Sequence, residues 1–303
     1  MTPDKKIHPD NTGRGGNIIR IKKSDIEKLR QEMKKNKEEA VKAKAAAASA
    51  EADDAKPTGE GIAPILEQTS PEISVPLSGE AIRAFKEYAR LLREWNEVMN
   101  LTNIVDDSGI AMRHFIDSLT LVPFIEEEQE KKGKKNLSLI DVGTGAGFPG
   151  IPVKVRMSEI DLTLLDSLKK RIGFLDEVVK TLDLKNVKTV HSRAEDAGHN
   201  KLYREKFDMA TARAVASLPV LCEYCLPFVK TNGIFLAMKG HVEEELEESS
   251  KAIAKLGGTV ETVKKFVLPG TDMDRSVVVI RKTRPTPLTY PRQAGKPSKD
   301  PIK

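Results

Sequence analysis

The segment that most constrains the fold is a short apolar run followed directly by alternating glycines, LSLIDVGTGAGFPG at residues 137–150. Glycine has no Cβ, so it lets the backbone turn tightly and approach a bound ligand closely. A helix that opens after such a turn presents unpaired backbone N–H groups, which favour polar or negatively charged ligand groups. The segment therefore predicts a strand, a tight turn and a helix, with a ligand site at the turn.

Further β-type runs follow, and helical patterns separate most of them. We expect strands at residues 137–142, 161–166, 187–191, 207–212, 233–239, 260–268 and 276–282, and helices near 150–157, 168–182, 218–229 and 242–256. Such alternation predicts an α/β fold of the Rossmann-like type, with one doubly wound, seven-stranded, mostly parallel sheet. A short loop separates the last two strands, which predicts an antiparallel hairpin. A nucleotide-like ligand is expected at the carboxyl ends of the parallel strands.

The region before this alternation predicts a helical cap at residues 76–136. Apolar residues recur every three or four positions from Ile82 to Met99, and Ser78 is a suitable N-cap for a helix that carries them. A shorter helix is expected at about residues 113–124. The charged run EEEQEKKGKK at residues 126–135 is expected to be a linker.

The two ends of the chain differ from the rest in composition. Residues 1–75 contain no aromatic residue and carry a mixed-charge, Ala-rich block, so we expect a disordered or partly helical extension, with an interaction arm as the alternative. Residues 281–303 hold seven basic side chains against one acidic side chain. We expect a basic C-terminal tail at residues 283–303 that either contacts RNA phosphates or is merely solvated.

Several kinds of protein and site are disfavoured by what the sequence lacks. No apolar run approaches the ~20 residues that span a bilayer, and residues 1–10 hold no apolar signal-peptide stretch. The two cysteines, Cys222 and Cys225, lie in an apolar helical segment, which favours core packing over a metal or redox role. We therefore expect a cytoplasmic protein with no metal and no membrane association.

Two cofactors compete for the glycine turn. The run GAGFPG at residues 145–150 matches the dinucleotide fingerprint, and Asp166 at the end of the second strand could bind ribose hydroxyls of either cofactor. Two features favour a cofactor other than a dinucleotide. One is the register of Asp141 with three alternate glycines, and the other is Pro149 at the helix opening, where a pyrophosphate would lie. This register resembles the S-adenosylmethionine motif of class I methyltransferases, whose cofactor carries an ammonium and a sulfonium instead of a pyrophosphate.

A more specific resemblance rests on motifs spread over residues 77–303. They occur in order and at matching spacing: Trp95-Asn96, Asn100-Leu101-Thr102, Arg113-His114, Asp117-Ser118, IDVGTGAGFPGIP at 140–152, Leu165-Asp166-Ser167, Lys170-Arg171, Ser192-Arg193-Ala194-Glu195, Arg213-Ala214, Met238-Lys239-Gly240 and YPRQAGKPSKDP at 290–301. In these motifs the chain resembles the bacterial 16S ribosomal RNA guanine-N7 methyltransferases, a family also called glucose-inhibited division protein B. Residues 1–75 lie outside the resemblance.

The resemblance implies a methyltransferase domain at residues 137–282 that uses S-adenosyl-L-methionine to methylate N7 of a guanine in 16S ribosomal RNA of the small ribosomal subunit. Gly143 and Phe148 would line the methionine end of the cofactor, Asp166 its ribose, and Ala194 with Glu195 its adenine. The full set of implied cofactor-site positions is Asp141, Gly143, Gly145, Gly147, Phe148, Asp166, Ala194, Glu195 and Arg213.

The chemistry of the implied reaction can be weighed from the residues. Arg193 and Lys239 match family positions on the RNA side, and no residue is assigned as a catalytic acid or base. Guanine N7 carries a lone pair and no proton, so methyl transfer to it needs positioning and electrostatics but no general base. Other guanine or ribose targets stay open on chemistry alone.

Two alternatives to this function stay open at the level of sequence. One is a methyltransferase of the same fold with a small-molecule or protein substrate. The other is a non-catalytic RNA-binding assembly factor. In each case we expect a monomer.

Overall fold

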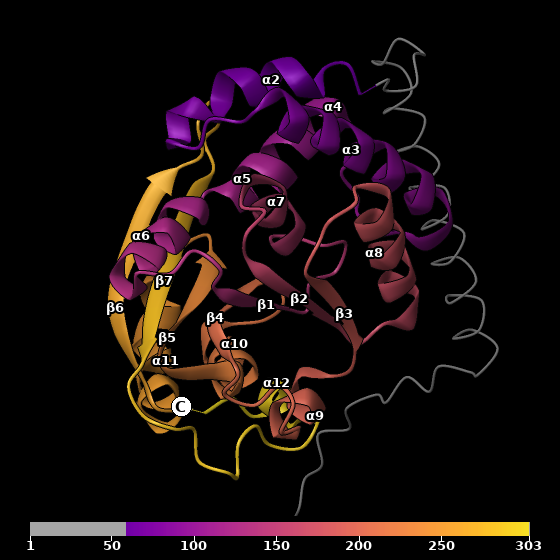
Figure 1. The fold of residues 1–303 in the computed structure, drawn as a ribbon. Helices are drawn as coiled ribbons and strands as arrows, with labels where there is room; N and C mark the ends of the chain where they lie inside the picture. Colours follow the sequence, from indigo (N-terminus) through magenta and orange to yellow (C-terminus); the bar gives the residue numbers. More distant parts are fainter. Residues whose placement is uncertain (1–58, 303) are drawn as a thin grey trace, which may run out of the picture. The chain divides into compact units, whose positions relative to one another are not determined.

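The structure of the chain is a computed structural model that describes residues 59–302. Within these residues seven strands form one sheet in the order β3-β2-β1-β4-β5-β7-β6 (Figure 1). The strands are β1 Ser138–Val142, β2 Asp161–Asp166, β3 Val187–His191, β4 Phe207–Arg213, β5 Val229–Lys239, β6 Gly258–Val267 and β7 Asp274–Lys282. β1 to β5 run parallel, whereas β7 is antiparallel to both β5 and β6. The predicted fold class is confirmed.

The strand order reverses at β1, which pairs with β2 on one side and with β4 on the other. In a parallel α/β sheet the connections leave opposite faces at such a point, and a crevice opens beyond the carboxyl ends of the two strands. The glycine turn at residues 143–150 follows β1 directly. The topology therefore places the predicted ligand site at the switch point.

Helices cover both faces of the sheet, and each face has its own hydrophobic core. One core joins α3 Gly79–Met99, α7 Gly150–Arg156 and α8 Lys169–Thr181 to the sheet, and the other joins α9 Ala194–His199, α10 Leu218–Cys225 and α11 Glu243–Lys255. Successive strand residues alternate between the cores: Leu139 belongs to the first and Ile140 to the second. This period of two is what a strand buried on both faces requires.

α3 begins where the sequence predicts. The Ser78 hydroxyl accepts a hydrogen bond from the Ala81 backbone N–H at 3.2 Å, which satisfies one of the unpaired donors of the first turn. Its apolar stripe includes the fully buried Phe85, Tyr88 and Leu92. α3 is thereby fixed to α7 and α8, directly beside the glycine turn.

The boundary expected at residue 75 differs from the structure. Residues Ile62–Thr69 form helix α2, and a 3₁₀ turn follows at Pro71–Ile73. Ile62 and Leu66 lie one helical turn apart and are both fully buried in the first core, so this short segment has enough apolar surface to dock. The remainder of the predicted extension, residues 1–58, lies outside the described residues.

The linker expected at residues 126–135 is also wrong for most of its length. After the short segments α4 Asp107–Gly109, a π-helix at Ile110–Ile116 and α5 Asp117–Leu119, helix α6 runs over Val122–Lys132. It ends at Gly133, whose φ of +60° is the left-handed conformation that favours glycine at a helix end. The charged run stays helical because one of its carboxylates, that of Glu128, is buried against β7.

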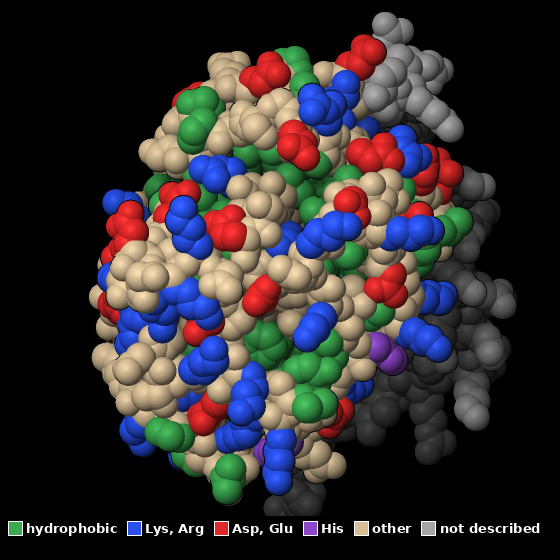
Figure 2. Space-filling model, viewed as in Figure 1, with side chains coloured by type: hydrophobic (Ala, Val, Ile, Leu, Met, Phe, Trp, Pro, Cys, Tyr) green, Lys and Arg blue, Asp and Glu red, His purple; other side chains and the backbone are tan. Residues whose placement is uncertain are grey.

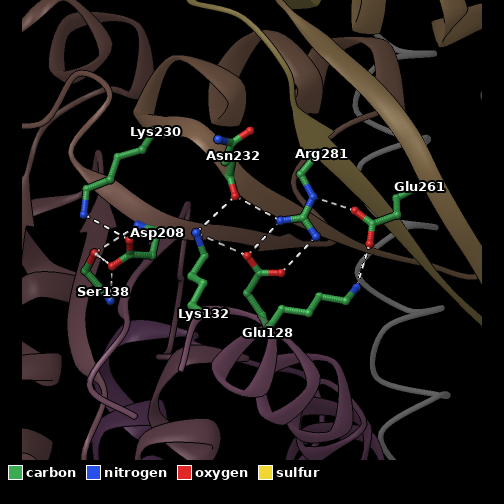
Figure 3. Close-up of polar contacts among 9 residues, drawn as sticks. Glu128, Lys132, Ser138, Asp208, Lys230, Asn232, Glu261 and Arg281 are labelled. Atoms are coloured by element: carbon green, nitrogen blue, oxygen red, sulfur yellow. Dashed lines mark hydrogen bonds and ion pairs between the residues drawn. The ribbon is translucent and has the colours of Figure 1, made fainter. Parts of the chain in front are cut away.

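This carboxylate is the centre of a polar cluster that ties α6 to the C-terminal hairpin (Figure 3). The Arg281 guanidinium donates to both oxygens of Glu128, at 2.8 and 2.9 Å, and to Glu261 in β6 at 2.6 Å. The hydrogen bond from Arg281 lowers the pKa of Glu261 to about 2. Lys132 and Arg281 both donate to the carbonyl of Asn232, at 3.1 and 3.0 Å.

The basic C-terminal tail is packed onto the fold over its described length, residues 283–302, which include α12 Lys296–Lys299. The Arg292 guanidinium pairs with the buried carboxylate of Glu223 in α10, and the fully buried Lys282 ammonium donates to the Leu226 carbonyl at 2.6 Å. Two of the four basic residues in 283–302, Arg292 and Lys296, are in ion pairs within the chain, as are Arg281 and Lys282 at the end of β7. The segment is therefore not a free basic arm.

Elsewhere on the surface the two signs of charge are mixed. Basic and acidic side chains are interspersed over much of the face shown in Figure 2. Of the helices in residues 59–302, none is long and apolar enough to cross a membrane.

We expect Glu128→Ala to lower the free energy of unfolding by about 3 kcal/mol, because removing one partner of a buried ion pair leaves the other without compensation. Glu127→Ala is the matched control in the same helix turn. Its carboxylate pairs with Lys131 but is 60% exposed, so the loss should stay below about 0.5 kcal/mol. Urea unfolding of the two variants measures the difference, and equal effects would contradict a stabilising role for the cluster.

Candidate active site at the carboxyl end of the sheet

Three neighbouring cavities, which share lining residues, make up a crevice at the carboxyl ends of the parallel strands. The tail cavity, about 250 Å³, is lined by Asp166, Arg193, Glu195, Tyr224, Gly295 and Ser298, among others. The loop cavity, about 420 Å³, is lined by residues that include Thr102, Gly143, Gly145, Phe148, Asp166 and Arg171. The arginine cavity, about 430 Å³, is lined by residues that include Arg113, His114, Asp117, Arg213, Lys239 and Arg275. Gly143 and Asp166 are shared by the first two cavities, and His114 and Arg213 by the last two.

Two glycines of the turn, Gly143 and Gly147, are required by close contacts. Gly143 has a φ of +70°, and a Cβ there would lie 2.8 Å from a methyl carbon of Val215. A Cβ at Gly147 would lie 2.5 Å from the Tyr88 hydroxyl oxygen. A Cβ at Gly145 would meet nothing within 4 Å, so this residue faces open space in the loop cavity. The turn thus leaves room for a ligand on one side and packs tightly on the other.

Asp141 lies beneath the turn and does not line any of the three cavities. Its Oδ2 accepts hydrogen bonds from the Thr144 hydroxyl at 2.6 Å and from the Gly150 N–H at 2.8 Å. Burial raises the pKa of this carboxyl to about 6, and Oδ1 has no hydrogen-bond partner among the described residues. The sequence led us to expect a direct ligand contact, whereas the contacts that the structure gives Asp141 hold the ends of the turn together.

Asp166 lies where the tail and loop cavities meet. Its Oδ2 accepts the Gly145 N–H at 3.0 Å and lies 3.3 Å from the Arg171 guanidinium, and its Oδ1 accepts the Leu168 N–H at 2.8 Å. The side chain is 2% exposed, so its position is fixed. A carboxylate at the end of β2 that faces two cavities is suited to bind hydroxyl groups of a ligand.

Ala194 and Glu195 open helix α9 and line the tail cavity with Arg193. The Glu195 carboxylate is nearly buried, and its Oε1 accepts the backbone N–H of Gly295 at 2.9 Å. The partner comes from the C-terminal segment, which the sequence did not connect with this site. Arg193 and Lys239, both assigned to one RNA side from the sequence, line different cavities.

Phe148 sits in a stack of rings between the turn and the cap helices. Its ring is 4.5 Å from that of His114 at an interplanar angle of 10°, and 5.3 Å from that of Tyr88. The Arg213 guanidinium carbon lies 5.2 Å from the Phe148 ring centre. The Tyr88 hydroxyl donates to the Ala146 carbonyl, so α3 supports the turn directly.

The arginine cavity is organised by one buried carboxylate. Asp117 accepts from the Arg213 guanidinium at 2.8 Å and from the Arg275 guanidinium at 2.7 Å. Lys239 pairs with Glu245 at 2.8 Å and donates to the Ala216 carbonyl. The four basic side chains that line this cavity exceed its one carboxylate, so the cavity favours an anionic ligand.

His114 borders both the loop cavity and the arginine cavity. It is 8% exposed, and its Nε2 is 2.9 Å from the Thr102 hydroxyl. Burial, reinforced by the charge of Arg213, lowers the pKa of His114 to about 4. The ring is therefore uncharged at neutral pH.

Arg275, Tyr224 and Gly295 line the crevice but were not predicted as site residues. Arg275 follows the first residue of β7, and an antiparallel strand begins at the edge where its parallel neighbours end. The position of Arg275 at the start of an antiparallel strand is therefore a sequence signal that could have predicted it as a site residue. The two cysteines are buried in the second core, and no metal-ligand cluster occurs among residues 59–302.

The crevice fits a nucleoside that carries a charged chain. Two fixed carboxylates, Asp166 and Glu195, line the tail cavity at one end. Gly145, with open space beside it, and the ring of Phe148 line the loop cavity in the middle. The basic residues lie at the far end, beyond Arg213. The crevice thus offers separate places for a cofactor and for an anionic substrate.

Comparisons with known proteins point to one family. A family model described as GidB, rRNA small subunit methyltransferase G, matches residues 81–277. A curated protein of Acetivibrio thermocellus, named ribosomal RNA small subunit methyltransferase G, is 56% identical over 228 residues, which are 75% of this chain and 91% of that protein. A protein of the same name from Desulforamulus reducens is 47% identical over 238 residues, 78% of this chain and 97% of its own.

The state of His114 can be tested through the pH dependence of stability. Between pH 6.5 and 4 the unfolded chain binds a proton at this residue and the folded chain does not, so stability falls as the pH falls. We expect the free energy of unfolding of the wild type, relative to that of His114→Gln, to drop by about 3 kcal/mol over this range. Urea unfolding at a series of pH values measures it. A difference independent of pH would mean that the buried ring is protonated as easily as a free one.

Proposed function

The chain belongs to the rRNA small subunit methyltransferase G family, and from this premise we propose that it transfers a methyl group from S-adenosyl-L-methionine to N7 of a guanine in 16S ribosomal RNA. The observation that carries the proposal is the crevice from Glu195, past the glycine turn, to Arg275. Along it, carboxylates come first, then the open turn and the Phe148 ring, then basic side chains, which is the order of groups that a cofactor followed by a nucleotide would need.

We place the cofactor in the tail and loop cavities. Ala194 and Glu195 would contact the adenine, Asp166 the ribose hydroxyls, and Gly143 with Phe148 the methionine end. Support comes from the carboxylates fixed at one end and from the turn that leaves room at Gly145. Asp141 and Gly147 would act from behind by shaping the turn, because neither lines the tail, loop or arginine cavity.

We place the guanine nucleotide at the arginine cavity. Arg213 and Arg275 are held by Asp117 and can face a phosphate without losing their position. His114 and Phe148 stack on each other at the border with the loop cavity, where an uncharged ring surface can contact a base. Lys239 lines this cavity, whereas Arg193 would contact RNA from the tail cavity.

The proposed methyl transfer needs no general acid or base in the chain. When bound, S-adenosylmethionine supplies a methyl group on a positively charged sulfur. The chain's residues would bring the guanine N7 lone pair into line with that methyl group, exclude water, and stabilise the arrangement electrostatically. Asp117 is the carboxylate that lines the arginine cavity, and its two arginine partners make it a positioning group and not a base.

We further propose that the protein acts as a monomer in the cytoplasm without a metal. The crevice is complete within one chain, which supports a monomer. Both cysteines are free and buried, as expected in a reducing compartment.

The deciding experiment is methyl transfer from labelled S-adenosylmethionine to small subunits and to naked 16S RNA from a strain that lacks the protein. We expect label in 7-methylguanosine, identified after digestion to nucleosides. Comparing the two substrates shows whether the folded subunit is required. Label in another nucleoside would contradict the N7 assignment, and cofactor binding without RNA labelling would favour a small-molecule or protein substrate.

The absence of a general base predicts a further property. In single turnover, with RNA and cofactor saturating, the rate of methyl transfer should be constant between about pH 6.5 and pH 8.5, because N7 has no proton to lose. A rapid-quench time course at each pH measures the rate. A rate that rises tenfold per pH unit would show that a deprotonation precedes the transfer.

A further inference from the structure

We propose that the C-terminal segment, residues 290–302, is a wall of the cofactor site that holds Glu195 in position to bind the amino group of adenine. The proposal rests on the proposed function, since it assigns the adenine to the tail cavity. The basic charge of the segment had suggested that it binds RNA, and the proposal gives it a role in cofactor binding instead. Glu195 would contact the cofactor, and Gly295 would act through it as a positioning residue.

The segment is anchored by a buried ion pair. The Arg292 guanidinium donates to both oxygens of Glu223, from Nε to Oε1 at 2.9 Å and from Nη2 to Oε2 at 2.7 Å, and the Arg292 backbone N–H adds a third hydrogen bond at 2.7 Å. Glu223 is fully buried in α10, so its charge must be paired where it stands. This pairing fixes the start of the segment.

Further contacts continue the anchoring around α9. The His199 ring Nε2 is 2.6 Å from the Pro291 carbonyl, and the Arg204 guanidinium donates to the Tyr290 carbonyl at 2.7 Å. At the far end Pro297 is buried, and Ile302 belongs to the second core. Figure 1 shows the resulting path, in which α12 lies beside α9 at the lower end of the sheet.

Between these anchors the segment faces the tail cavity. Gly295 and Ser298 both line it, together with Asp166 and the first residues of α9. The Gly295 N–H donates to Oε1 of Glu195 at 2.9 Å. A carboxylate can accept several hydrogen bonds, so Glu195 can hold this donor and still accept from a ligand amine in the cavity. A donor that fixes the carboxylate beforehand reduces the entropy that ligand binding costs.

The charges of the segment argue against a main role in RNA binding. Arg292 pairs with Glu223, and Lys296 pairs with Asp300 at 2.6 Å. Lys299 carries no ion pair among the described residues. It is therefore the one basic side chain of residues 290–302 that has no ion pair there. The geometry directs the segment to the cofactor end of the crevice, away from the arginine cavity.

The first test removes residues 295–303 and keeps the ion pair between Arg292 and Glu223. Isothermal titration with S-adenosylhomocysteine should show a Kd raised about tenfold, as expected when a charged hydrogen bond loses its fixed geometry. The same titration with S-inosylhomocysteine, which has an oxygen in place of the amino group, supplies the specific readout. The truncated chain should discriminate less between the two ligands than the full chain does, which a general loss of stability would not cause.

A second test uses a substitution that the fold tolerates. Ser298 is exposed to solvent while lining the cavity, and its hydroxyl donates to the Gly295 carbonyl at 3.1 Å, so Ser298→Leu should lower the melting temperature by only a few degrees and raise the Kd for S-adenosylhomocysteine several-fold. Lys299→Leu is the matched control, because it is the exposed neighbour and does not line the cavity. If the truncated chain does not fold, this pair of variants decides.

The outcomes separate the two proposals. If the full chain binds neither ligand, the proposed function fails. If the full chain binds S-adenosylhomocysteine and the truncated or Ser298→Leu chain binds it equally well with unchanged discrimination, the wall does not exist. A truncation that lowers the salt dependence of RNA affinity while the Kd for the cofactor product stays the same would return the segment to RNA binding.

Discussion

Everything at this site depends on the shape of one backbone turn, and that shape is imposed from beneath. The turn at residues 143–150 is held by carboxylates at the ends of two neighbouring strands: Asp141 binds Thr144 and Gly150, and Asp166 binds Gly145. Tyr88 from the cap presses against Gly147 from the other side. Side chains are excluded on the packed side, where a Cβ at Gly147 would meet Tyr88 and one at Gly150 would meet Asp141, while the space beside Gly145 stays open.

Much of this arrangement could be predicted from the sequence, for identifiable reasons. β2 and β3 have the residue bounds that their β-type runs predict, and Ser78 caps α3 as expected, because local pattern alone decides these features. The glycine turn was predicted because alternating glycines directly after a strand indicate a tight turn, and the positive φ values of Gly143, Gly145 and Gly147 confirm it. The place of β7 between β5 and β6 could not be predicted, since strand order depends on contacts between segments distant in the sequence.

The buried ion pairs were missed for one physical reason, which is that charge in a sequence does not disclose its partners. Glu128 looks like part of a solvated run, and Glu223 interrupts an apolar helix, yet each is buried against an arginine of the C-terminal region. A carboxylate within an apolar stretch is a usable signal, because it is stable there only with a cation nearby. The same reasoning would have connected Arg292 to the fold.

The two outer strands of the sheet, β3 and β6, affect how the protein can associate with other molecules. An edge strand exposes unpaired backbone groups and invites pairing with a second molecule, and charged side chains are the common protection against it. β3 carries the exposed Lys188, and β6 carries Lys264 and Lys265, both exposed. A second molecule that paired along either edge would meet these charged side chains. The margins of the sheet thus discourage the growth of extended β-aggregates, even though its centre is made of apolar strands.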